Sequence, residues 1–156
     1  TTVALPAAQT MPHGGVGLTM SKLMAVREQF AIDDYDLDME EPVMAVYPKE
    51  MTDLLGIVEA AGTSINLAAQ APMREGKVSR FMRLTFIEIN RLPLDGTTRS
   101  CPAWMPSNIV LGVQQEIAGD IWNDTHAGNT PYMDVGGRFD CTRKEDKGVI
   151  VVECTE

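Results

Sequence analysis

Near the start of the chain, the spacing of apolar residues predicts an amphipathic helix. Met20, Leu23, Val26 and Phe30 recur every three or four positions, which places them on one face of a helix. Thr19 comes just before this pattern and is a suitable N-cap. We therefore expect a helix that begins at Thr19 and buries one apolar stripe.

A strand and a second helix are expected next. Residues 43–47 form a short apolar run that suits a buried strand, and Pro48 fits the first position of a helix. We expect this helix to continue through residues 49–55 and to end near Gly56.

The second half of the chain has the alternation that is typical of strands. Residues 80–89 give the strongest signal and are expected to form one strand, with Met82, Leu84 and Phe86 on one face. The pair Asp95-Gly96 marks a turn after this strand. Shorter strands are expected at 101–105, 108–113 and 117–123.

The last two strands are expected to pair with each other as a hairpin. Their arms are residues 133–142 and 149–154, and residues 144–148 supply the turn. The final strand is apolar at both odd and even positions, so both of its faces should be covered.

The length and the loops indicate one domain with both helices and strands. The chain has 156 residues and a mass of 17.1 kDa, which is typical of a single domain. Residues 1–16 are rich in proline and glycine and are expected to be a connector, and residues 62–79 a long loop.

The charge excludes several classes of partner. Lys plus Arg number 13 and Asp plus Glu number 22, which gives a net charge of −9. Binding to nucleic acid phosphates or to anionic lipid needs clustered basic residues, so neither is expected. No apolar run reaches the roughly 18 residues that span a bilayer. Three widely spaced cysteines do not form a disulfide framework and favour a reducing, intracellular origin.

The acidic segment at residues 33–41 suggests a calcium loop and then departs from that pattern. Asp34, Asp36 and Asp38 occupy the first, third and fifth positions of an EF-hand. The loop position that requires glycine holds Met39, and the position that requires glutamate holds Ala45. We interpret the segment as a solvated acidic loop, with a weak cation site as the less favoured alternative.

No catalytic, cofactor or metal site is expected from the remaining motifs. Cys101, His126 and Asp120 could form a nucleophilic triad, but no nucleophile signature surrounds the cysteine, and buried cysteines usually act as small hydrophobes. His13 and His126 lack the neighbouring ligands of a catalytic zinc site.

Three further features have structural interpretations. Residues 14–17 read Gly-Gly-Val-Gly and lack the Lys-Ser/Thr ending of a phosphate loop, so they are interpreted as linker. Trp104 and Trp122 lie within expected strands, where core or interface packing is favoured over ligand stacking. Gly136-Gly137 is interpreted as a bulge or a close backbone approach.

Five groups of residues, in order along the chain, resemble a known family. They are Gly17-Leu18-Thr19 with Lys22-Leu23 and Arg27-Glu28; residues 46–55; residues 86–93; Ala103-Trp104 with residues 109–113; and Gly137 with residues 142–149 and 152–154. In order and spacing, residues 17–156 resemble the C-terminal half of a tailed-bacteriophage major capsid protein of the Hong Kong-ninety-seven fold.

The resemblance implies an α+β fold and a structural, non-enzymatic role. It implies an axial-domain mixed sheet flanked by helices, ending in a peripheral-domain β-hairpin. Residues 1–16 would be a connector, residues 17–130 the axial domain at the capsomer hub, and residues 131–156 the closing strands of the peripheral domain. The N-terminal arm, extended loop and spine helix of the family would precede Thr1.

The resemblance also implies partners and a location. Copies of the chain would form pentamers and hexamers of an icosahedral head that encloses double-stranded DNA without sequence-specific binding. Portal or decoration proteins would be further partners, and no membrane is involved. The subunit would be made in the bacterial cytoplasm of the host and end in the virion. Two alternatives stay open: an encapsulin-type nanocompartment shell protein, and a small cysteine hydrolase that uses Cys101 and His126.

Overall fold

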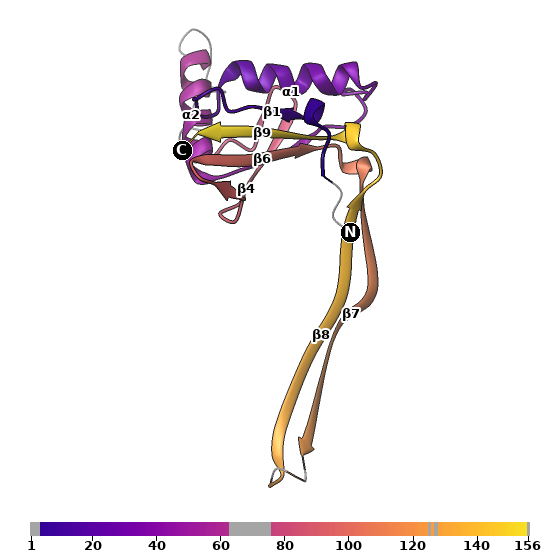
Figure 1. The fold of residues 1–156 in the computed structure, drawn as a ribbon. Coiled ribbons are helices and arrows are strands. Elements are labelled where there is room, and N and C mark those ends of the chain that lie inside the picture. Colours follow the sequence, from indigo (N-terminus) through magenta and orange to yellow (C-terminus); the bar gives the residue numbers. More distant parts are fainter. Residues whose placement is uncertain (1–3, 63–75, 125, 127, 156) are drawn as a thin grey trace.

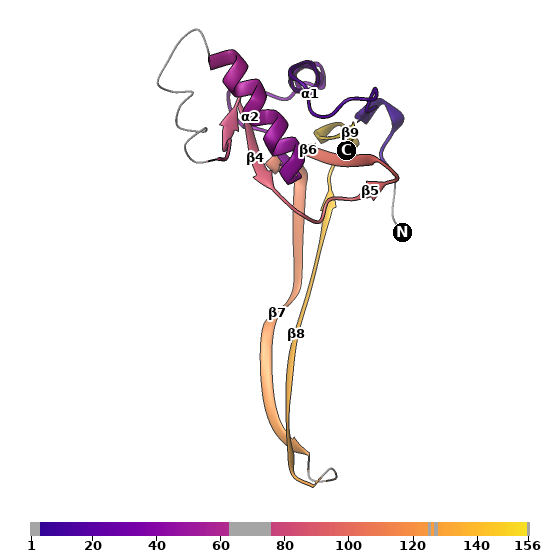
Figure 2. The ribbon, with the colours of Figure 1, turned by 90° about the vertical axis from the view of Figure 1, so that its left-hand side faces the viewer.

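The chain folds into a two-layer body from which a long two-stranded arm projects (Figure 1). The structure is a computed structural model that describes residues 4–62, 76–124, 126 and 128–155. We call residues 109–143 the arm and the other described residues the body. The arm points away from both helices of the body in two perpendicular views (Figures 1 and 2).

The first expected helix is confirmed. Helix α1 spans Met20–Ile32, and the Thr19 hydroxyl caps it by accepting a hydrogen bond from the Lys22 backbone N–H. Leu23, Val26 and Phe30 are fully buried against the sheet, while Met20 lies at the edge of the stripe and is 36% exposed.

The second helix begins where expected and runs further than expected. Helix α2 spans Pro48–Gly62, so it passes through Gly56 instead of ending there. A glycine inside a helix costs only about 1 kcal/mol relative to alanine, and burial of Met51, Leu54 and Val58 offsets this cost.

The body contains a mixed seven-stranded sheet. Its order is β1-β9-β6-β2-β4-β3, with β5 beside the first part of β6. The β1–β9 and β2–β4 pairs are parallel and the others are antiparallel. The strands are β1 Thr10–Met11, β2 Val43–Val46, β3 Arg80–Phe81, β4 Leu84–Glu88, β5 Leu94–Asp95, β6 Thr98–Trp104 and β9 Val149–Thr155. Short 3-10 turns occur at Ala7–Gln9, Pro106–Asn108 and Asp146–Gly148.

The expectation of one strand over residues 80–89 is wrong. The chain reverses at Met82 and Arg83, whose φ angles are 52° and 65°, and β3 then pairs antiparallel with β4. Such left-handed turns usually contain glycine or asparagine, and their absence here concealed the turn. The expected connector also contributes structure, because β1 adds a parallel strand beside β9.

The expected pairing of the last two strands is also wrong. Strand β8, Thr130–Arg143, pairs antiparallel with β7, Ile109–Asp124, and these two strands make up the arm. Strand β9 returns to the body and lies between β1 and β6. The two shorter strands expected within residues 108–123 are one strand interrupted by irregularities near Val113 and Gln115. The expected loop at 62–79 lies mostly outside the described residues.

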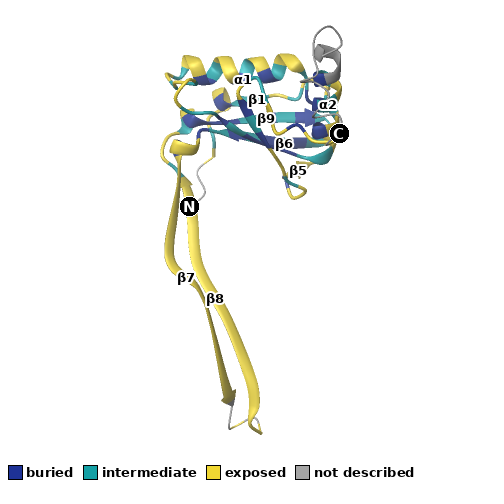
Figure 3. Ribbon diagram, turned by 180° about the vertical axis from the view of Figure 1, so that it is seen from behind, coloured by how far each residue is buried: buried dark blue, intermediate teal, exposed yellow. Residues whose placement is uncertain are grey.

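The core lies within the body. Figure 3 shows buried residues concentrated in the sheet and the inner sides of the helices, while the arm is exposed along its length. The coverage expected for both faces of the final strand is complete on one face only, where Ile150, Val152 and Cys154 are buried. On the other face Val149 is buried and Val151 is half-buried. Among the described residues, neither helix is long and apolar enough to cross a membrane.

Candidate functional site: an exposed apolar arm

The register of the arm puts its apolar side chains on one face. Residues directly opposite each other in an antiparallel ribbon point to the same side. Val113 lies opposite Phe139, and Ile121 lies opposite Met133. The alternation of β8 adds Val135 to this side. We call this the apolar face of the arm; it consists of Leu111, Val113, Ile121, Met133, Val135, Phe139 and Cys141.

The opposite face of the arm is mostly polar. Asp120 lies opposite Asp134, and Gln115 lies opposite Arg138. We call this the polar face; it consists of Gln115, Asp120, Asp134, Arg138, Asp140 and Thr142, with the Trp122–Tyr132 pair near the tip. The arm is therefore an amphipathic ribbon. Such alternation is the usual pattern of a sheet that covers a hydrophobic core with one side.

Within the described residues, nothing covers the apolar face. Val135 is 62% exposed, Phe139 is 66% exposed and Met133 is 71% exposed. An isolated two-stranded ribbon is at best marginally stable in water, and a contiguous exposed apolar surface usually marks an interaction site. The arm is therefore a surface suited to bind other protein.

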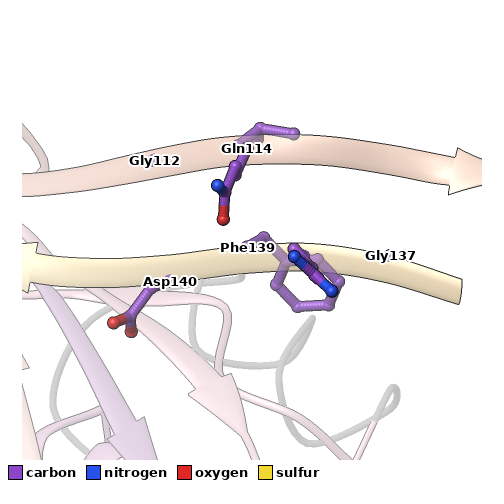
Figure 4. Close-up of a pocket in the computed structure, with 7 residues that line it drawn as sticks. Gly112, Gln114, Gly137, Phe139 and Asp140 are labelled. Carbon is purple, nitrogen blue, oxygen red and sulfur yellow. The ribbon is translucent and has the colours of Figure 1, made fainter.

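A shallow hollow of about 610 Å³ lies where the arm bends. Figure 4 shows Gly112 and Gln114 on one strand facing Gly137, Phe139 and Asp140 on the other. A Cβ atom at Gly137 would lie 3.2 Å from Cγ1 of Ile117, so the glycine permits a close approach of the strands. This agrees with the interpretation of Gly136-Gly137 made from the sequence.

The root of the arm is held by the buried side chain of Asn108. Its Nδ2 donates to the Glu145 carbonyl at 2.8 Å, and its Oδ1 accepts from the Glu145 N–H at 2.9 Å. The Asn108 carbonyl also accepts from the Lys144 N–H at 2.8 Å. Gly148 packs directly against the Asn108 side chain and the Tyr35 hydroxyl, leaving no space there for a Cβ. These contacts fix the two strands where they leave the body.

The electrostatics of the root favour a neutral tyrosine. Burial raises the pKa of Tyr35 above its ordinary value of 10.0, and the carboxylates of Glu145, Asp33 and Glu40 raise it further. Tyr35 also packs edge-on against Phe30, with ring centroids 6.1 Å apart. The same side chain therefore contacts both α1 and the root of the arm.

The acidic loop was expected to be solvated, and none of its residues is buried, but it also makes contacts with the body. The Glu40 carboxylate accepts hydrogen bonds from the Ser107 N–H at 2.6 Å and from the Ser107 hydroxyl at 2.5 Å. Asp38 forms an ion pair with Arg83. The carboxylates therefore serve local contacts with the body.

The three residues of the imagined triad do not come together. Cys101 is buried in β6 of the body, whereas Asp120 lies on β7 of the arm and His126 lies near its far tip (Figure 1). The two tryptophans have packing environments. Trp104 packs against the edge of the core, and Trp122 stacks on Tyr132 with ring centroids 6.2 Å apart.

This arrangement matches the fold of solved viral and shell proteins. A structure from Mycobacterium phage Che8 superposes with a TM-score of 0.71 at 15% identity, covering 92% of this chain and 52% of that one. The mature capsid of bacteriophage PhiM1 gives a TM-score of 0.62 at 15% identity, with coverages of 86% and 45%. The holo-SrpI encapsulin complex of Synechococcus elongatus gives 0.57 at 12% identity, with coverages of 96% and 54%.

The structural matches establish the fold of this chain, and the match of its sequence to a family model establishes its family. The chain has a mixed α+β fold of the Hong Kong-ninety-seven type, and it spans about half the length of the structures it matches. A family model for phage capsid proteins matches residues 1–156, and the chain belongs to this family of phage capsid proteins. No curated protein matches the sequence.

Proposed function

We propose that the chain is a structural subunit of an icosahedral phage head and that it has no catalytic role. The observation that carries this proposal is the uncovered apolar face of the arm, in a chain of the capsid protein family. A shell subunit must bury surface against its neighbours, and the apolar face of the arm supplies such a surface. Identical subunits that meet head to tail, through two different surfaces, close into a ring when the rotation between neighbours divides the circle.

We further propose a division of roles between the two parts. The body, which contains both helices and the core, forms the capsomer hub of pentamers and hexamers. The arm forms the capsomer edge and lies against other protein. The boundary between residues 130 and 131 that the resemblance implies falls at the start of β8, so we place the boundaries at the root of the arm instead, before Ile109 and after Arg143.

The proposed contents and partners of the shell follow from the capsid protein family. The shell encloses double-stranded DNA, and the net charge of −9 fits a surface that does not bind its sequence. Portal and decoration proteins are further partners, and the virion is the final location of a subunit made in the bacterial host. A nanocompartment shell is the second candidate, because an encapsulin has a similar fold.

The role of the arm is tested by two double variants, each of which leaves the net charge of the chain unchanged. Val135→Gln/Phe139→Gln makes the apolar face polar, and Asp134→Gln/Arg138→Gln alters neighbouring positions on the polar face. Size exclusion with light scattering measures association as salt is raised, which screens repulsion beyond about 10 Å at 0.1 M. We expect the unmodified chain and the polar-face variant to associate more strongly than the apolar-face variant, in which only the contacts of the body remain. Equal association of all three proteins would contradict the proposal.

The nature of the contents separates the two candidates. Particles purified from the producing host should hold DNA that nuclease digests only after the shell is opened. Particles that instead hold a cargo protein and no protected DNA would favour the nanocompartment.

A further inference from the structure

Three metal-ligating side chains meet in the interior of the body. Glu50 lies in the first turn of α2, Cys101 on β6 and Cys154 on β9. Their donor atoms, one carboxylate oxygen and two sulfurs, all lie within 4.8 Å of one another. Glu50 is 1% exposed and both cysteines are 0% exposed. Three separate elements therefore direct donors to one buried point.

The strand register makes a direct disulfide between the two thiols unfavourable. Cys101 lies opposite Val152, and Cys154 lies opposite Arg99, so the cysteines are diagonal neighbours on one face of the sheet. Diagonal neighbours have Cα atoms about 7–8 Å apart, whereas disulfides rarely exceed about 6.8 Å. Both cysteines are free. The two sulfurs are therefore better placed to bind one metal ion together than to form a disulfide.

We propose that Glu50, Cys101 and Cys154 form a binding site for a thiophilic divalent cation, of which Zn²⁺ fits best. Zinc binds thiolate at about 2.3 Å and carboxylate at about 2.0–2.2 Å. Two sulfurs that bind the same ion are therefore at most about 4.6 Å apart. The three donor atoms here all lie within 4.8 Å of one another, so small shifts of the side chains would bring them into range of one ion. Water completes the fourth position, as it does where zinc has three protein ligands.

One positively charged side chain lies close to the site and would offset part of the negative charge of its ligands. The ammonium group of Lys22 is held nearby by the carbonyls of Val16, Gly17 and Glu153 at 2.8–2.9 Å. Binding of the ion releases the thiol protons of Cys101 and Cys154 to solvent and forms metal–sulfur bonds to both thiolates, without oxidation or reduction.

The site would join α2 to strands β6 and β9, which already pair with each other in the sheet. Helix α2 and strands β6 and β9 each supply one ligand. A cation bound to the folded chain, and not to the unfolded one, raises the midpoint of thermal unfolding. The site lies away from the arm, so this role is independent of the assembly proposal.

Titration of the metal-free protein with Co²⁺ and Zn²⁺ tests the site directly. We expect one equivalent of Co²⁺ to produce the intense charge-transfer absorption of cobalt thiolates, and Zn²⁺ to displace it and raise the unfolding midpoint by several degrees. Cys101→Ala and Cys154→Ala should abolish the absorption, whereas Cys141→Ala, which alters the exposed cysteine of the arm, should leave it unchanged. Glu50→Gln should keep the absorption and weaken affinity at least tenfold.

The unmodified chain makes the test independent of whether the variants fold. Circular dichroism of each variant identifies any that are unfolded, and those are set aside. Absence of cobalt–thiolate absorption in the folded, reduced, unmodified chain would overturn the proposal. So would absorption that survives in folded Cys154→Ala, or a Cys101–Cys154 disulfide in the protein as purified.

Discussion

The side chain of Asn108 forms two hydrogen bonds with the backbone of one residue, Glu145, although 37 positions separate them. Asn108 ends the turn that leads into β7, and Glu145 follows the end of β8. One amide group therefore joins the outgoing and returning strands at the root of the arm. Because Asn108 is only 3% exposed, water does not readily replace these bonds.

Replacement of this amide should loosen the root. Asn108→Ala removes both hydrogen bonds and leaves a backbone donor and acceptor of Glu145 unsatisfied, at a cost of about 1–3 kcal/mol. Urea unfolding measures the loss, and hydrogen exchange should become faster at residues 144–148. Asn123→Ala, at an exposed position of β7, is the matched control and should change stability little. Equal effects of the two variants would show that Asn108 does not hold the root.

The stripe of α1 should contribute strongly to the stability of the body. Leu23 is fully buried, so Leu23→Ala should leave a cavity and lower the free energy of unfolding by about 2–5 kcal/mol. The adjacent Met24 is 54% exposed, and Met24→Ala should have little effect. Denaturant curves of the two variants that overlap would contradict the assigned packing of α1.

Tyr35 should make the protein sensitive to alkali. Its pKa is raised above 10.0 in the folded chain, so the unfolded chain ionises first. The stability that this difference contributes is therefore complete below about pH 10 and is lost as pH rises through the folded pKa. Thermal midpoints measured across this interval should fall more steeply for the unmodified protein than for Tyr35→Phe. Parallel curves would show that the environment of Tyr35 does not shift its pKa.

The sequence predicted the two helices well, because the signals for a helix and its first residue lie within a few neighbouring positions. The spacing of Leu23, Val26 and Phe30, with the cap at Thr19, was sufficient for α1, and Pro48 marked the start of α2. The turn at Met82-Arg83 was missed because neither residue type favours a positive φ angle.

The errors in strand pairing have a different physical origin. Strands β8 and β9 follow each other across a short turn, which favours a hairpin, but pairing is decided by which surfaces can be buried. Strand β9 is apolar on both faces and enters the core, while β8 has one polar face and pairs with β7. The meeting of Glu50, Cys101 and Cys154 could not be predicted from their spacing, because it depends on three elements and the sheet order.

The central claim is that this chain builds a shell by burying the apolar face of its arm against other protein. Electron cryomicroscopy of the assembled protein tests this claim most directly. We expect rings or closed particles in which Val135 and Phe139 are covered by protein outside the arm, with the bodies gathered around the symmetry axes. Assemblies in which this face of the arm remains open to solvent, or a protein that stays monomeric at every salt and protein concentration, would contradict the account.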